Sequence, residues 1–240
     1  MLGVPLETFR GNKIVMAVAA LVAAGIAWGF VEACADEGAA CWMWMAVVLA
    51  PLGFLVYWLS SVEIIIHDGG ISSKTCLGTK EMRWDDVTRF TYTATRQSVN
   101  FIPVGTYYQL NLEGQPGQKI RIGNRASGME KLSTQLLQHT LPPLVRRAVE
   151  QFNSGLEVDF GSIRLSREGG FKSKGLFKTI EVPLDQVVDY RIEGGHFYVF
   201  RQGKKFAAIS APLAQVPNAF ALLALLDSLF QRTPSPPAGS

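Results

Sequence analysis

The chain has 240 residues, of which 48% are hydrophobic and 18% charged, and its formal net charge is +3 at pH 7. This length allows one or two ordinary domains. The apolar residues are concentrated near the N-terminus in two long runs without charge, a distribution that argues against an ordinary soluble protein.

The first 62 residues are predicted to form a transmembrane hairpin of two helices. No charged residue occurs from 14 to 31 or from 39 to 62, and each run is long enough to cross the about 30 Å hydrocarbon core. Neither run has the polar stripe of a buried helix in a soluble protein. A cleaved signal peptide is disfavoured because the second run follows too closely. Lipidation at Cys34 is disfavoured because Glu32 occupies a position that requires a small or apolar residue.

Basic residues near the two runs predict that both termini are cytoplasmic. Arg10 and Lys13 precede the first run, and basic residues at 74, 80 and 83 follow the second. The connector from 32 to 38 has three acidic residues and no basic one. Since Lys and Arg are retained on the cytoplasmic side, we expect the remaining chain to lie on the cytoplasmic face of a bacterial inner membrane.

Cysteines and small residues bear on how the hairpin packs. Cys34 and Cys41 flank the external connector, where an oxidising compartment could join them; two buried thiols are the alternative. Small residues let helix backbones approach closely, either within the hairpin or in self-association. The candidates for such packing are Gly25, Gly29, Ala46, Ala50 and Gly53. No ionisable residue lies in the middle of either run, which argues against a channel or transporter formed by one copy.

From residue 63 onward, short alternating apolar runs broken by Gly, Asn and Asp predict antiparallel strands. The clearest strands are 62–67, 106–112, 119–122, 162–165, 187–192 and 197–201. Two stretches have helical apolar spacing: 129–152, interrupted at Pro142 and Pro143, and 219–231, with Asn218 as its N-cap. The tail, 233–240, is predicted to be disordered.

Aligning the sequence with itself at an offset of 100 residues indicates an internal repeat. Seven identities occur among about 25 aligned positions, beginning with Gly69 and Gly70 against Gly169 and Gly170. The predicted fold class is therefore a membrane α-hairpin of two transmembrane helices (1–62) followed by a mainly-β, α+β soluble part. That part comprises two units, 63–154 and 155–232, each an antiparallel sheet closed by a C-terminal helix.

Three short motifs carry a resemblance to a known architecture. They are Arg83-Trp84-Asp85-Asp86-Val87, its counterpart Pro183-Leu184-Asp185-Gln186-Val187, and Val216-Pro217-Asn218-Ala219-Phe220. Through these motifs, residues 63 to 232 resemble an uncharacterised bacterial membrane-anchored family with tandem pleckstrin-homology-like (PH-like) domains. The resemblance implies two bent antiparallel sheets, each with one open corner filled by the closing helix. Leu184 replaces the tryptophan of the motif in the second unit.

A search for catalytic, metal-binding and cofactor-binding patterns finds none. The histidines at 67, 139 and 196 lie on separate predicted elements and lack the spacing of a zinc site. The sequence has no Gly-rich phosphate loop, no nucleophile elbow and no Cys with a local His partner. We therefore expect a non-enzymatic protein with no cofactor, no small-molecule substrate and no nucleic-acid partner.

Two candidate contact surfaces follow from charge and apolarity. From residue 63 onward, 21 Lys and Arg stand against 16 Asp and Glu. Five lysines near the predicted β-hairpins are candidates to face an anionic leaflet, and each would contribute about 1 kcal/mol of electrostatic attraction to it. The alternative is a solvated basic face. The five lysines are Lys74, Lys80, Lys172, Lys174 and Lys178. The second surface contains Phe101 and Ile102, which are either core residues or an exposed contact tip.

These observations favour a membrane-tethered interaction or scaffold module that acts through its PH-like units. Its partners would be the lipid bilayer and either another protein or further copies of itself, because open strand edges are common binding surfaces. Two alternatives remain: a module that binds an anionic lipid headgroup, and an accessory subunit of a larger membrane complex that docks through the small-residue helix.

Overall fold

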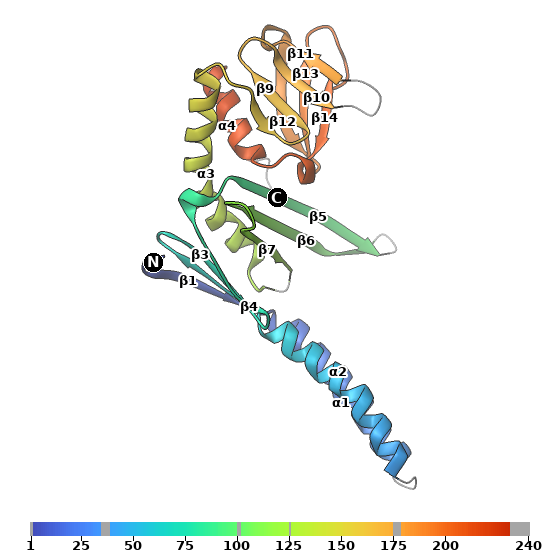
Figure 1. Cartoon of the computed structure of the whole chain (residues 1–240). Helices are drawn as coiled ribbons and strands as arrows, with labels where there is room; N and C mark the ends of the chain where they lie inside the picture. The colour runs from blue at the N-terminus through green and yellow to red at the C-terminus, as the bar shows by residue number, and fades with distance from the viewer. Residues whose placement is uncertain (1, 35–38, 100–101, 125, 175–178, 231–240) are drawn as a thin grey trace. The chain divides into compact units, whose positions relative to one another are not determined.

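A computed structural model describes residues 2–34, 39–99, 102–124, 126–174 and 179–230 of the chain. The chain forms two compact units. The first comprises Met1–Arg83 with Ile122–Leu132, and the second comprises Trp84–Arg121 with Ser133–Ser240. The described elements are α-helices, single 3-10 turns and four antiparallel sheets (Figure 1).

The first unit contains a four-stranded sheet in the order β1-β2-β3-β4. Its strands are β1 (Pro5–Arg10), β2 (Glu63–His67), β3 (Gly70–Thr75) and β4 (Gly78–Arg83). Because side chains alternate along a strand, Ile64, Ile66 and Ile71 are buried on one face. Strand β1 lies within the segment predicted as part of the hairpin. Its partner β2 follows so much later in the chain that no local turn pattern indicates the pairing.

Helices α1 (Lys13–Cys34) and α2 (Ala39–Ser60) lie side by side, between the paired strands β1 and β2 in the chain (Figure 1). Large apolar side chains are exposed along both helices, including Leu21 at 72%, Trp28 at 68% and Phe54 at 61%. Exposed apolar faces of this size are uncommon on soluble monomers.

The prediction of two transmembrane helices is wrong. Among the described residues, one helical stretch is long and apolar enough to cross a bilayer: Met16–Cys34, with 19 residues, a mean hydropathy of 1.9 and 6% of the stretch buried. A core helix and a signal sequence meet the same criteria of length and composition. In α2, the apolar stretch among the described residues is the shorter Ala46–Trp58.

The single turn η1 (Trp84–Asp86) begins the second unit, and a three-stranded sheet in the order β5-β6-β7 follows it in the chain. The strands of this sheet are β5 (Arg89–Val99), β6 (Ile102–Glu113) and β7 (Lys119–Gly123). Strands β5 and β6 form a long hairpin in which Arg89 pairs with Glu113. Leu110 and Leu112 on β6 are fully buried, which anchors the base of this hairpin in the core.

Helix α3 (Met129–Asn153) is continuous through Pro142 and Pro143, where the sequence predicts an interruption. Contacts on both sides of the proline pair hold the helix. His139 stacks on Trp84 with ring centroids 5.0 Å apart, and the Arg147 guanidinium donates hydrogen bonds to the backbone carbonyls of residues 85 and 87. Tertiary contacts therefore override the local preference of proline to end a helix.

The rest of the second unit consists of two sheets and a closing helix. The first sheet, in the order β11-β10-β9-β8, comprises β8 (Val158–Phe160), β9 (Ile163–Ser166), β10 (Gly170–Lys174) and β11 (Thr179–Val182). The turn η2 (Leu184–Gln186) leads into the second sheet, β12 (Val187–Glu193), β13 (His196–Arg201) and β14 (Ile209–Pro212). The turn η3 (Leu213–Gln215) and α4 (Ala219–Leu229) follow. One apolar core includes Phe160, Phe171 and Phe197 from the sheets and Leu222 and Leu226 from α4.

The predicted grouping of strands is also wrong, because the sequence predicts two sheets and the described chain has four. Along the chain, η1 and η2 each stand between a four-stranded and a three-stranded sheet. A 3-10 turn forms hydrogen bonds along its own backbone, so each predicted sheet ends there and a new one begins. The resemblance to PH-like domains and the predicted domain bounds stay predictions.

Candidate anion-binding pocket

Two predicted basic residues, Lys172 and Lys174, lie on β10 and share one face of their sheet. The residues between and beside them, Phe171 and Ser173, point inward and are buried. In the register of the sheet, Lys172 stands opposite Arg164 of β9, and Lys174 stands opposite Thr179 of β11. Since directly opposed residues project on the same side, three cations occupy one face.

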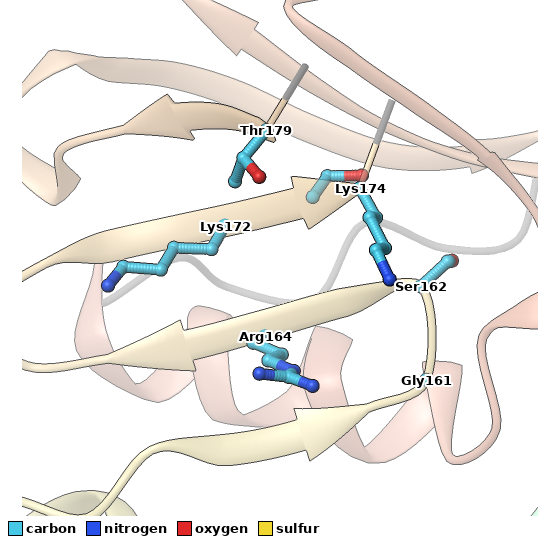
Figure 2. Close-up of a pocket in the computed structure, with 7 residues that line it drawn as sticks. Gly161, Ser162, Arg164, Lys172, Lys174 and Thr179 are labelled. Carbon is cyan, nitrogen blue, oxygen red and sulfur yellow. The ribbon is translucent and has the colours of Figure 1, made fainter. Parts of the chain in front are cut away.

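These side chains border a pocket of about 240 Å³ in the second unit. Figure 2 shows the Lys174 side chain extending from the end of β10 toward Ser162, just before β9. Arg164 lies on β9 and Thr179 at the start of β11, while the Lys172 side chain extends away from Ser162. The lining residues are Gly161, Ser162, Arg164, Lys172, Ser173, Lys174 and Thr179. The pocket therefore combines cationic groups with hydroxyl donors and has no acidic residue in its lining.

The β8–β9 turn fixes the position of Ser162. Gly161 has a positive φ of 75°, and its N–H donates to Asp159 Oδ1 at 2.8 Å. The Ser162 backbone N–H donates to the Gln215 carbonyl at 3.0 Å. The Ser162 hydroxyl is buried, and among the described residues it has no hydrogen-bond partner. A buried hydroxyl without a partner is costly unless a ligand or water satisfies it.

Ion pairs only partly neutralise the cations. Arg164 lies 3.3 Å from Glu157, and Lys172 lies 3.9 Å from Glu181. The side chains of both pairs are between 37% and 60% exposed, so each pair contributes at most about 1 kcal/mol. Within the described part of the chain, Lys174 forms no ion pair. A bound anion therefore competes only with weak pairs, and phosphate oxygens match this set of donors.

The other predicted basic residues do not join this pocket. Lys74 and Lys80 lie in the first unit, where Lys74 is paired with Thr79 and Lys80 with Ser73. Because residues 73 and 74 point to opposite faces, so do the two lysines, and the prediction that they face lipid stays a prediction. Lys178 lies outside the described residues.

Among the described residues, the predicted helix-packing positions border open space. A Cβ at Gly25, Gly29 or Gly53 would meet no atom within 4 Å, and Ala46 and Ala50 are exposed. Both alternatives, packing within the hairpin and self-association, stay predictions for these residues.

Other predicted sites have mixed outcomes. Cys34 is buried and disulfide-bonded, whereas Cys76 is a free thiol. The side chain of Cys41 lies outside the described residues, so the predicted pairing stays a prediction. Phe101 also lies outside them, as does the side chain of Ile102 at the start of β6. The contact tip is therefore untested.

Sequence reasoning missed Arg164, Ser162 and Thr179 as pocket residues. The alternation in 162–165 and 170–174, joined by a Gly-Gly turn, predicts a hairpin in which residue 164 opposes residue 172. That register could have identified Arg164. The pocket hydroxyls depend on the β8–β9 turn, for which the sequence has no comparable signal.

Within the described residues, no group of three His, Cys, Asp or Glu side chains lies close enough to hold a metal ion. His67 lies 3.2 Å from the Ser72 hydroxyl, His139 stacks on Trp84 and His196 lies beside Tyr198. The three imidazoles are thus parts of separate local contacts.

Residues 1–235 match the model of a family described as a family of unknown function, DUF6585, and the chain belongs to this family. No curated protein matches the sequence.

Proposed function

We propose that this member of the family is a non-enzymatic, membrane-associated module that binds the anionic, phosphate-bearing headgroup of a lipid in the pocket on β9, β10 and β11. The observation that carries the proposal is that Arg164, Lys172 and Lys174 share one face of the sheet, with Lys174 beside Ser162. Among the described residues, the buried Ser162 hydroxyl has no hydrogen-bond partner. Cations with flanking hydroxyl donors form charge-assisted hydrogen bonds to phosphate, which are stronger than neutral ones.

Membrane association is supported by the stretch Met16–Cys34 and by its exposed apolar side chains. Arg10 and Lys13 precede the stretch, which favours a cytoplasmic location for the N-terminus. On that side of the membrane the leaflet is anionic, and each basic residue near its surface contributes about 1 kcal/mol of attraction.

The order of elements supports duplication of one structural unit. A four-stranded sheet, a single 3-10 turn, a three-stranded sheet and a helix follow one another twice, and β3 and β10 begin at Gly70 and Gly170. This order is compatible with tandem PH-like domains, which we retain as part of the proposal.

The headgroup proposal is tested with full-length protein in a neutral detergent and dihexanoyl phosphatidic acid as the probe. The double variant Arg164→Gln/Lys174→Gln should bind the probe about tenfold or more weakly, since two charge-assisted contacts are lost. Isothermal titration calorimetry measures the affinity. The charge-matched control Lys204→Gln/Lys205→Gln changes two exposed lysines outside the pocket and should bind as the wild type does. Equal affinities of all three proteins, or equal binding of dihexanoyl phosphatidylcholine, would refute the proposal.

A second candidate function is the interaction or scaffold role, in which α1 packs against another copy of the chain. The observation that favours it is the open space at Gly25 and Gly29, which lie four residues apart on one helix face. Such a spacing lets two helix backbones approach closely in a membrane.

A further inference from the structure

A polar cavity of about 360 Å³ lies in the first unit, where α2 ends and the sheet begins. It is lined by Arg10, Tyr57, Ser60, Ser61, Val62, Glu63, Lys74, Thr75 and Cys76. The lining comes from the last turn of α2 and from the ends of β1, β2 and β3. The cavity is thus separate from the pocket on β9, β10 and β11.

The strand register places alternating charges in a row across this cavity. Arg10 of β1 stands opposite Glu63 of β2, and Glu63 stands opposite Lys74 of β3. Glu63 lies 3.4 Å from the Arg10 Nε. Within the described residues, Lys74 forms no ion pair. The row therefore has an excess positive charge, which favours an anion in the cavity.

Hydroxyl groups cap the helix end that faces the cavity. Ser60 Oγ donates to the Tyr57 carbonyl at 2.8 Å, and Ser61 Oγ donates to the Trp58 carbonyl at 3.0 Å. These bonds satisfy carbonyls of the last turn, whose partial negative charge would otherwise repel an anion.

The neighbouring hairpin turn presents a large apolar side chain to the outside. Leu77, between β3 and β4, is 88% exposed. Two hydrogen bonds from backbone N–H groups fix the turn. The Leu77 N–H donates to Thr75 Oγ1 at 3.3 Å, and the Cys76 N–H donates to Ser61 Oγ at 3.0 Å. An apolar tip held beside cations is the pattern of side chains that insert at a membrane surface.

The cavity also lies at one end of the candidate membrane span. Arg10 precedes Met16, the first residue of that span, by six positions. Tyr57 is 59% exposed, and tyrosine is favoured at the level of lipid headgroups. Cations, an interfacial aromatic and an apolar tip thus gather where the span ends.

We propose that this cavity binds the headgroup of an anionic phospholipid, with its phosphate contacted by Lys74 and by Arg10, which lie on either side of Glu63, and with Leu77 inserted beside the acyl chains. The inference rests on the membrane association in the proposed function. It adds a lipid site next to the span, on residues that the pocket in the second unit does not share.

The test uses full-length protein that already carries Arg164→Gln/Lys174→Gln, so that the pocket in the second unit does not contribute. Dioleoyl phosphatidylglycerol or dioleoyl phosphatidylcholine is added in mild detergent, and native mass spectrometry counts the retained lipids. We expect preferential retention of phosphatidylglycerol, and we expect Arg10→Gln/Lys74→Gln to lower it about fivefold or more. Lys204→Gln/Lys205→Gln in the same background is the charge-matched control and should retain the lipid.

A second variant, Leu77→Ser, separates lipid contact from folding, because this side chain is not part of the core. It should also lower retention while the thermal unfolding midpoint stays unchanged. Equal retention of the two lipids, or retention unaffected by Arg10→Gln/Lys74→Gln, would overturn the inference. Carbonate extraction distinguishes this failure from a failure of the proposed function. If the protein stays in the membrane pellet, only the lipid site is refuted. If carbonate releases the protein, membrane association itself is refuted.

Discussion

Gly161 and its neighbours determine the shape of the pocket at the β8–β9 turn. A Cβ at Gly161 would lie 2.6 Å from the Gln215 carbonyl oxygen and 2.7 Å from Pro217 Cδ. The residue must therefore be glycine for lack of space as well as for its positive φ. This close approach holds the turn against the segment that leads into α4, and it places Ser162 beside the cations.

Replacement of Gly161 by alanine tests this account of the turn. Gly161→Ala should lower the free energy of unfolding by about 1–3 kcal/mol more than Gly155→Ala, because backbone must shift to admit the Cβ. Gly155 is the matched control, since its φ of 76° imposes the same strain and a Cβ there would meet no atom within 4 Å. Urea denaturation of both variants measures the difference. Equal losses would mean that the contact with residue 215 is not tight.

Asn218 shows a limit of reasoning from residue type. The sequence predicts it as the N-cap of the last helix, and it occupies that position, with a φ of 59° and no capping hydrogen bond. Its side chain instead accepts a hydrogen bond from the Phe90 N–H at 2.7 Å and donates one to the Thr88 carbonyl at 2.9 Å. The residue thus links α4 to β5, a contact across 128 positions that no local pattern indicates.

At the scale of elements, local periodicity predicts six of the fourteen described strands and the last helix to within a few residues. β2, β7, β12 and β13 lie where alternation places them, and α4 begins at the predicted Ala219. Failures occur where distant contacts decide: β1 pairs with a strand beyond the helices, and α3 crosses two prolines because Trp84 and Arg147 hold it. The same limit applies to the pocket on β9, β10 and β11. The alternation of residues along the strands predicts that its lysines share a face, but no local pattern predicts where its hydroxyl groups lie.

The open face of α1 provides a test of the self-association candidate. If two copies pack at Gly25 and Gly29, then Gly29→Leu should convert a dimer into a monomer, because a large side chain separates the backbones. Ala20 is exposed and lies about 180° around the helix from Gly29, so Ala20→Leu should leave the dimer intact. Native mass measurement in mild detergent gives the oligomeric state. A wild-type monomer, or a dimer in both variants, would refute packing at this face.

At the scale of the whole molecule, both binding proposals require that the chain reside at a membrane. Lys174 and Arg164 in the second unit and Arg10 and Lys74 in the first are exposed, and in water these cations would bind a soluble anion only weakly. Anchoring changes this balance, because it confines the basic faces near an anionic leaflet and so raises the effective concentration of headgroups. The function of α1 thus determines whether the two pockets have a ligand to bind.

A charge placed within α1 tests this requirement directly. Val22 is 54% exposed and lies within Met16–Cys34, and an arginine in the middle of a membrane helix costs about 2.5–3.5 kcal/mol. We expect the wild-type chain to remain in the pellet after carbonate extraction of membranes and Val22→Arg to be released in large part. Val188→Arg, at a 52% exposed position on β12, is the control and should stay in the pellet. If the wild type is itself released, α1 does not anchor the chain, and both lipid sites lose the membrane on which they depend.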